Sequence, residues 1–201
     1  MSIDRAALIA AIERVGAAME RDAGMLNAAD GALGDGDLGV TLTRGTRLVC
    51  EQAADMPDDL GRALMMCAQG FTKASGSSYG TLLATGLMAI AKAVKGETRI
   101  DASRIAELAA AARDAMQARG KAELGGKTVL DSLDAVARAT EGLTEPGAVA
   151  EAACGGVDAA LEEYRDRRAT VGRARIFADK SVGLDDPGML AMARIVHAIA
   201  G

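Results

Sequence analysis

The fold is decided by the segment Leu8–Met25, LIAAIERVGAAMERDAGM, and by the stretch that follows it, Asp30–Gly39, DGALGDGDLG. In the first segment apolar residues recur at helical spacing in an alanine-rich background, which predicts a helix and not a strand. The second stretch holds three aspartates and four glycines, and a new helical pattern begins at Leu38. The sequence therefore predicts a helix, a glycine-rich acidic loop and a second helix.

Three carboxylates lie close together in that loop, at Asp30, Asp35 and Asp37. Carboxylates this close repel one another unless a cation lies between them, and oxygen ligands favour Mg²⁺ or Ca²⁺ over zinc or copper. The first N–H groups of the following helix have no partner within that helix, so they form a natural seat for phosphate. Together these features predict a site for a nucleotide with Mg²⁺.

Three other interpretations of the loop are weaker. The glycine pattern Gly34–Gly39 matches the dinucleotide-binding fingerprint in its letters, but that fingerprint requires a preceding strand. A calcium loop that begins at Asp30 places Thr41 where the bidentate glutamate belongs, and one that begins at Asp35 fails in the same way. An acidic turn that only caps the second helix is common for one aspartate but explains three poorly.

The composition favours an all-α fold. The chain has 201 residues, of which 44 are alanine, ten are methionine and four are aromatic. Small and unbranched side chains let helices pack closely, whereas strands prefer β-branched and aromatic residues. A chain of this length buries a sizeable core, and no linker or repeat divides it. Residues 1–201 are therefore predicted to form a single domain.

Charge and residue types exclude several classes of function. The formal net charge of −5 and the lack of a dense basic run argue against nucleic-acid binding. No apolar stretch reaches the length that crosses a membrane, and the first residues do not follow the plan of a signal peptide, so we expect a cytoplasmic protein without membrane contact. The three cysteines have neither zinc nor disulfide spacing, and the single histidine, His197, is expected to be a surface or packing residue.

Hydrophobic periodicity and breaker residues predict eight helices. They run over Asp4–Leu26, Leu38–Ala53, Asp58–Lys73, Ser78–Val94, Asp101–Arg119, Lys127–Thr140, Pro146–Arg168 and Pro187–Ala200. Asp58 and Asp101 are expected as N-caps, and Pro187 suits the first turn of the last helix. The connection Ala169–Asp186 is long for a compact domain, so we expect an irregular loop that serves as a lid or a binding loop.

Two further turns precede predicted helices. Ala74–Thr81 contains glycines and hydroxyl side chains, and it is either a phosphate contact or an ordinary helix cap. Gly125–Thr128 ends like a Walker A motif, but that motif requires a preceding strand and a glycine at the position of Lys121. The Walker A interpretation is therefore rejected, and the start of a helix remains.

A set of short motifs resembles the nucleotide-binding L subunit of dihydroxyacetone kinase over nearly the whole chain. The motifs are Gly34-Asp35-Gly36-Asp37-x-Gly39, Ala74-Ser75-Gly76, Tyr79-Gly80-Thr81, Gly120-Lys121-Ala122-Glu123, Lys127-Thr128, Gly172-Arg173-Ala174 and Asp186-Pro187-Gly188. Each is modest alone, but their order and spacing are specific. The resemblance implies an eight-helix antiparallel barrel or bundle with the nucleotide site at one end.

The resemblance also implies roles for individual residues. The metal ligands, for two Mg²⁺ ions that bridge the phosphates of ADP or ATP, would be Asp30, Asp35 and Asp37. The phosphate contacts would be Leu38, Gly39, Val40, Thr41, Ala74 and Ser75. The adenine pocket would include Gly120 and Val129, and the residues that close over the nucleotide would be Arg173, Asp186, Pro187 and Gly188. Three carboxylates and ADP bring a charge of about −6, of which two Mg²⁺ ions neutralise four and helix N-termini a further part.

The resemblance implies a division of labour between two proteins. In the family a separate K subunit or domain binds the ketose covalently through a histidine, and the L unit supplies the phosphoryl group. This chain would then be inactive alone, with a K-like substrate-binding partner and a homodimeric or heterotetrameric assembly. The phosphoryl donor is either free ATP or a phosphotransferase-system protein that recharges a resident ADP. The alternatives are a nucleotide-binding regulator that docks on a transcription factor, and a kinase subunit for another ketose or for a fatty acid.

The chain departs from the family pattern at several polar positions. Leu38 and Leu184 stand where the family commonly has histidine, and Gly126 stands where it has aspartate. Thr41 replaces an asparagine. The metal ligands are kept, so nucleotide binding follows from the resemblance more directly than the choice of dihydroxyacetone as acceptor.

Overall fold

The computed structural model describes residues 2–74 and 77–201. Its α-helices are α1 (Arg5–Leu33), α2 (Leu38–Glu51), α3 (Leu60–Ala74), α4 (Ser78–Ala93), α5 (Ile105–Gly120), α6 (Val129–Thr140), α7 (Pro146–Arg165) and α8 (Pro187–Ala200). The remaining elements are two strands, β1 (Ser2–Asp4) and β2 (Arg99–Asp101), and three 3₁₀ helices, η1 (Ala53–Asp55), η2 (Ala102–Arg104) and η3 (Ala174–Ser181). The predicted all-α fold is confirmed, with a two-stranded ribbon as a small addition.

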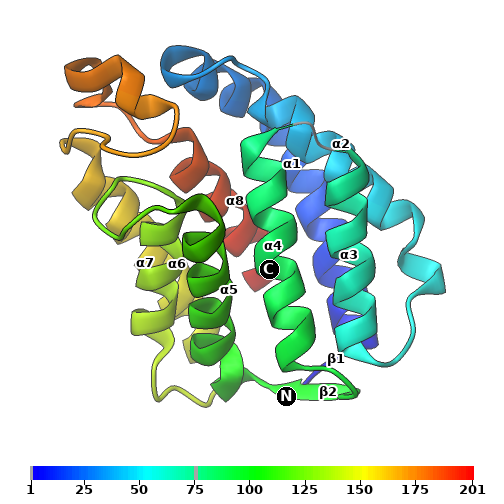
Figure 1. The fold of residues 1–201 in the computed structure, drawn as a ribbon. Coiled ribbons are helices and arrows are strands. Elements are labelled where there is room, and N and C mark those ends of the chain that lie inside the picture. Colours follow the sequence, from blue (N-terminus) through cyan, green and yellow to red (C-terminus); the bar gives the residue numbers. More distant parts are fainter. Residues whose placement is uncertain (1, 75–76) are drawn as a thin grey trace.

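The helices form a closed ring in chain order. Each helix packs against the next one along the chain, and α8 returns to pack against α1. In Figure 1 the helices run side by side between two ends of the molecule. The ribbon of β1 and β2 lies at the lower end, and the segment before α8, drawn in orange, lies at the upper end. The barrel therefore has two distinct ends.

The interior of the barrel consists of aliphatic and thioether side chains. Met19, Leu26, Leu42 and Met116 are each no more than 1% exposed and belong to one buried cluster. Their burial, at about 25 cal/mol per Å² of apolar surface, is the main force that holds the ring together. Among the described residues, no helix combines the length and the apolar character needed to cross a lipid bilayer.

The lower end is closed by the ribbon. β1 and β2 pair antiparallel with Ser2 opposite Asp101 and Ile3 opposite Ile100. Ile100 belongs to a buried cluster with Leu60, Val94 and Leu108, which seals this end. Two predicted N-caps are wrong. Asp101 belongs to the ribbon, and α5 begins at Ile105. At the start of α3, Arg62 N donates a hydrogen bond to the carboxylate of Asp59, at 3.1 Å, and not to that of Asp58.

At the upper end, α1 is longer than predicted. It continues past Leu26 to Leu33 because these two leucines lie seven residues apart, on one face, and both are buried in the core. Gly34 ends the helix. The prediction that Asp30 lies in a loop is therefore wrong, because Asp30 is in the last turn of α1.

The connection between α7 and α8 is also more ordered than predicted. It contains η3, so the expectation of a wholly irregular loop is wrong. Ala169 and Ala174 are buried, and with Phe177 they pack against Leu33 at the end of α1. Apolar contact thus holds this segment on the upper end of the barrel, whereas a fully solvated loop would lack such contacts.

Candidate functional site

The three aspartates meet where α1 passes into α2. Asp30 is in the last turn of α1, Asp35 is in the turn, and Asp37 is the N-cap residue of α2. Gly36, between the last two, has φ of 79°, a conformation that favours glycine and lets the chain reverse tightly. One carboxylate oxygen from each aspartate lies within 4.8 Å of those of the other two. The turn thus gathers three carboxylates at one point.

Asp30 also holds the start of α2 in place. Its Oδ2 accepts hydrogen bonds from Asp37 N at 2.9 Å and Leu38 N at 3.2 Å. One turn earlier in α1, Asn27 Oδ1 accepts a hydrogen bond from Val40 N at 3.2 Å. Nothing in the sequence pattern singles out Asn27, because only the packing of α1 against α2 brings its amide to the start of α2.

Gly39 lets the two helices come this close. A Cβ at this position would lie 2.2 Å from Ala23 O and 2.8 Å from Asn27 Oδ1, distances that no side chain tolerates. Because α1 lies against the first turn of α2, the N–H groups of Leu38 and Val40 have acceptors on α1, and Thr41 N donates to Asp37 O within α2. The predicted phosphate-binding N–H groups at these three positions are thus engaged within the chain.

The electrostatics of the cluster are uneven. Arg173, from the segment after α7, forms an ion pair with Asp35, and this hydrogen-bonded contact lowers the pKa of the Asp35 carboxyl. Burial raises the pKa of Asp37, and the neighbouring charges of Asp35 and Asp30 raise it further. The part of this rise that comes from Asp35 and Asp30 reflects crowded negative charge, which a bound cation would relieve.

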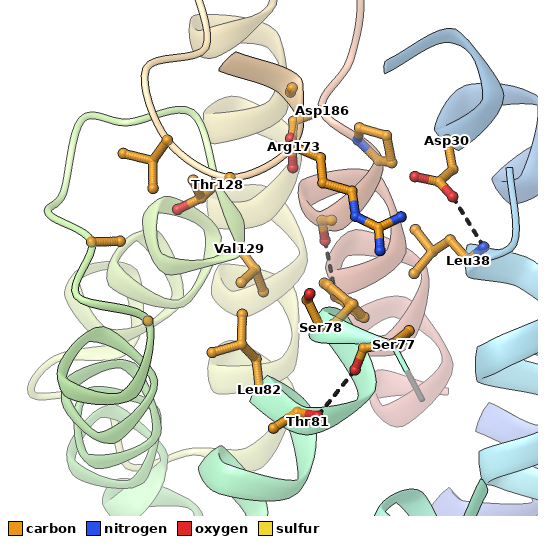
Figure 2. Close-up of a pocket in the computed structure, with 18 of the residues that line it drawn as sticks. Asp30, Leu38, Ser77, Ser78, Thr81, Leu82, Thr128, Val129, Arg173 and Asp186 are labelled. Carbon is orange, nitrogen blue, oxygen red and sulfur yellow. Dashed lines mark hydrogen bonds between the residues drawn. The ribbon is translucent and has the colours of Figure 1, made fainter. Parts of the chain in front are cut away.

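The aspartates form one side of a cavity of about 550 Å³ at the upper end of the barrel, a volume within the usual range for small-molecule sites. Figure 2 shows Arg173 reaching into it, with Asp30 and Leu38 on one side and Val129 and Leu82 on the other. The predicted residues that line it are Asp30, Asp35, Asp37, Leu38, Gly120, Val129, Arg173, Asp186, Pro187 and Gly188.

The wall opposite the aspartates is apolar. It includes Leu82 of α4, Met116 of α5, and Val129 and Leu130 of α6. The edge of this wall is fixed by Thr128, the N-cap of α6, whose hydroxyl accepts from Leu130 N while Asp131 accepts from Thr128 N in a capping box. One side of the cavity is therefore acidic, whereas the other combines these apolar side chains with Arg119 and with the hydroxyl groups of Ser78, Thr81 and Thr128.

The start of α8 completes the rim. Asp186 caps this helix by accepting from Met189 N at 2.9 Å, and Pro187 occupies the first turn as predicted. Tyr79 of α4 donates from its hydroxyl to Gly188 O at 2.9 Å, and a Cβ on Gly188 would lie 3.0 Å from Tyr79 Cε2. Burial raises the pKa of Asp186 to about 6. Tyr79 thus ties the Asp186–Gly188 turn to α4.

The structure does not bring every predicted residue to the cavity. Gly39, Val40 and Thr41 lie in the first turn of α2 but do not line it, and neither does Ala74 at the end of α3. Ser75 lies outside the described residues. Several lining residues escaped the prediction of individual roles, namely Ser77, Ser78, Tyr79, Thr81, Leu82 and Thr128. The Ser-Ser-Tyr-Gly-Thr run held the signal for four of them.

The departures from the family pattern have different surroundings. Leu38 is buried, and Leu184 is 41% exposed. A Cβ at Gly126 would lie 2.8 Å from Val171 Cγ2, so the aspartate of the family pattern requires Val171 to move. His197 lies outside the cavity and contacts Asp158 at 2.9 Å on the surface of the molecule, as expected of a surface residue.

Comparison with known proteins accounts for this combination of barrel and cavity. Residues 32–201 match the DAK2 domain. This chain belongs to the DAK2 domain family. It is 33% identical over 182 residues to the "PEP-dependent dihydroxyacetone kinase 1, ADP-binding subunit DhaL" of Listeria innocua, covering 87% of this chain and 85% of that protein. It is 30% identical over 180 residues to the L-erythrulose kinase of Pectobacterium atrosepticum, covering 85% of this chain but 30% of that protein.

Solved structures share the fold. The dihydroxyacetone kinase of C. freundii matches with a TM-score of 0.78 in its native form and 0.76 in complex with AMP-PNP and Mg²⁺. Each comparison covers 96% of this chain at 23% identity, and this chain spans about a third of that kinase. The implied membership in the family of dihydroxyacetone kinase L subunits, with its helical barrel, is confirmed.

Proposed function

We propose that this chain binds MgADP or MgATP at the upper end of the barrel and passes a phosphoryl group to a ketose held on a separate K-like subunit. The observation that carries the proposal is the meeting of three carboxylates and an apolar wall across one cavity. A nucleotide has the matching polarity, with phosphates that require cations and a base that prefers apolar surroundings. The ADP-binding subunit of Listeria innocua and the AMP-PNP and Mg²⁺ complex of the C. freundii kinase support the same assignment.

Asp30, Asp35 and Asp37 would hold the metal, as two Mg²⁺ ions. Their oxygens converge within 4.8 Å, they are the hard ligands that Mg²⁺ prefers, and the raised pKa of Asp37 reflects charge that a cation would neutralise. When bound, Mg²⁺ supplies charge neutralisation and alignment of the phosphates for transfer. The cluster therefore suits the cation that the phosphates need.

Arg173 and the helix starts would complete the phosphate site. In this structure the guanidinium pairs with Asp35, and a cation on Asp35 would free it to turn toward the phosphates, for which its planar fork of donors is suited. Leu38 lines the cavity, and its backbone would contribute a further contact, as would Ser75. Contacts from Gly39, Val40, Thr41 and Ala74 would require the start of α2 and the end of α3 to move toward the ligand. The segment that carries Arg173 covers part of the cavity and would keep water away from the transferred group.

The apolar wall would hold the base, with Gly120 and Val129 lining the adenine pocket. The Asp186–Gly188 turn at the rim would close over the nucleotide. In this arrangement the phosphates would lie on the α1–α2 side and the base on the α4–α6 side. The two ends of the nucleotide would thus meet surroundings of different charge and polarity.

The ketose would be bound elsewhere. The only histidine in the sequence, His197, lies outside the cavity, so the covalent histidine attachment used by the family requires the K-like partner. The chain would act as one subunit of a homodimer or a heterotetramer. Its phosphoryl donor would be either ATP or a phosphotransferase-system protein, and the name of the Listeria innocua relative favours the second donor. The L-erythrulose kinase relative supports a ketose other than dihydroxyacetone as an acceptor.

Two measurements test the proposal. Calorimetric titration with ADP is expected to show binding in the presence of Mg²⁺ and a large loss of affinity in EDTA. Absence of binding under both conditions would refute the nucleotide site.

Purified chain with MgATP and dihydroxyacetone or L-erythrulose is expected to form no phosphorylated product, and addition of its K-like partner is expected to start turnover. Robust turnover by the chain alone would refute the hypothesis that it is one subunit of a two-subunit kinase.

A further inference from the structure

Lys127 is the most deeply buried charged side chain among the described residues, at 1% exposure. Its Nζ donates to three main-chain carbonyls, those of Arg165 at 2.8 Å, Arg167 at 2.9 Å and Ser181 at 2.7 Å. The backbone of Lys127 has φ of 61°, an uncommon conformation for a residue with a side chain. A strained backbone and a buried cation each cost free energy, and other interactions in the folded protein must offset that cost.

The three contacts require the charged form of the side chain. A neutral amine has two N–H groups, whereas an ammonium has three, one for each carbonyl. Burial lowers the pKa of Lys127, but Arg165 O lies at the C-terminus of α7, where the helix dipole favours a cation. Charge-assisted hydrogen bonds of this kind are about twice as strong as neutral ones. Lys127 is therefore a strong connection between three pieces of backbone.

These pieces are the two ends of one segment. Arg165 and Arg167 lie where the chain leaves α7, and Ser181 lies at the end of η3. The same ends are joined by Ala169 N, which donates to Ser181 Oγ at 2.9 Å, and by Gly183 N, which donates to Arg165 O at 2.9 Å. Lys127 thus closes the base of a loop that we define as the clamp segment, residues 166–183.

The clamp segment forms part of the cavity. Its residues 171–174 line the cavity, and Arg173 reaches Asp35 from there. On the other side of Lys127, Thr128 caps α6 and fixes the edge of the apolar wall. Lys127 therefore stands at the junction between the residues that would meet the phosphates and those that would meet the base.

We infer that Lys127 is a positioning residue of the nucleotide site, whose buried ammonium holds the clamp segment so that Arg173 is presented to the phosphates. This inference rests on the proposed function for its ligand. The competing explanation is that the apolar contact of Ala169, Ala174 and Phe177 with Leu33 suffices to place the segment. In that case Lys127 would only compensate the carbonyls that surround it.

The test replaces Lys127 with methionine, which keeps the length and removes the three donors. Lys180→Met is the matched control, because Lys180 is an exposed lysine in the same segment. In nucleotide-free protein, hydrogen exchange of residues 166–183 is expected to rise at least about tenfold in Lys127→Met, with helices α1 to α5 unchanged. MgADP affinity is expected to fall about tenfold or more, and the control is expected to change neither quantity.

A double-mutant cycle separates positioning from general stabilisation. If Lys127 acts through Arg173, Lys127→Met is expected to lower MgADP affinity far less in an Arg173→Ala background than in the wild type. Fully additive losses, or a folded Lys127→Met protein with wild-type exchange and affinity, would overturn the inference. If the wild type itself binds no MgADP, the proposed function fails, while the exchange measurement still tests the clamp.

Lys127→Arg provides a second variant in case Lys127→Met does not fold. Arginine keeps the positive charge at the end of α7, but its planar group cannot direct one nitrogen at three carbonyls. A folded Lys127→Arg protein with faster exchange in residues 166–183 and weaker MgADP binding supports the inference. Failure of both variants to fold would overturn it, because Lys127 would then hold the barrel as a whole.

Discussion

The two ends of the barrel treat charge in opposite ways. At the lower end, Arg104 pairs with Glu97 at 2.7 Å and with Glu107 at 3.0 Å, and these hydrogen bonds raise the pKa of the guanidinium. At the upper end, three aspartates converge with Arg173 as the cation that pairs with one of them. At the lower end Arg104 is paired with two carboxylates, whereas at the upper end Arg173 is paired with one of three converging carboxylates.

The two ends differ in packing as well. The lower end is sealed by the ribbon and by a cluster of four buried aliphatic side chains, and the upper end keeps a cavity of about 550 Å³. Apolar burial at the lower end stabilises the barrel. The groups that line the cavity at the upper end are not packed in this way, so they are open to a ligand. We therefore expect substitutions at the lower end to change stability and substitutions at the upper end to change ligand binding.

The largest effect is expected from the aspartate cluster. Asp37→Asn removes one predicted metal ligand and is expected to weaken MgADP binding by about 100-fold or more, close to 3 kcal/mol. Without metal, the free energy of unfolding is expected to hold or rise, because the substitution relieves repulsion from Asp30 and Asp35. Calorimetry and urea unfolding measure the two quantities.

Glu97→Gln is the matched control at the lower end, because it removes a carboxylate that pairs with Arg104. It is expected to leave MgADP affinity unchanged and to lower stability by less than about 1 kcal/mol, as for other partly exposed pairs. Equal affinities for wild type and Asp37→Asn would refute the metal assignment and, with it, the contrast between the two ends.

An intermediate effect is expected from two glycines. A Cβ at Gly61, near the lower end, would lie 2.6 Å from Ala91 O and 2.7 Å from Lys95 Cα, so Gly61→Ala forces α3 away from α4. Its expected cost is about 2 kcal/mol of unfolding free energy without a change in MgADP affinity. Thermal unfolding and calorimetry measure these two effects.

Gly120 gives the opposite expectation. A Cβ there meets Leu82 Cδ2 at an ordinary 3.7 Å, so Gly120→Ala is expected to keep the stability of the barrel. The added methyl group would enter the proposed adenine pocket and weaken MgADP binding. A loss of affinity in Gly61→Ala, or of stability alone in Gly120→Ala, would show that the two ends are not independent.

The smallest effect is expected from Asp186. Burial raises its folded-state pKa to about 6 from an ordinary value of 3.8, so between pH 4 and 6 the folded protein holds a proton that the unfolded chain has lost. The contribution of Asp186 to the free energy of unfolding therefore falls as pH rises through that window. The expected fall is about 1 kcal/mol, because the side chain is partly exposed to solvent. Asp186→Asn is expected to remove this fall. Urea unfolding of both proteins at pH 4 and pH 7 measures it, and parallel pH profiles would contradict the raised pKa.

Much of the fold could be predicted because it depends on local pattern. Alanine-rich helical periodicity and the scarcity of aromatic residues indicated an all-α chain, and the glycine-rich acidic stretch indicated the position of the cluster. Local pattern failed where a distant partner decided the outcome. β2 forms because Ile100 pairs with Ile3, almost a hundred residues away, and this contact displaced the predicted start of α5.

The site shows the same division. The sequence by itself determined where the candidate metal ligands lie, because it places three carboxylates and four glycines within ten residues. Only the tertiary structure decided their environment: that Asp30 lies in the last turn of α1 and accepts from Leu38 N of α2, that Arg173 meets Asp35, and that Lys127 is buried among three carbonyls. These contacts join residues up to 138 positions apart. They depend on how helices close into a ring, and hydrophobic burial over the whole chain, not a local motif, sets that closure.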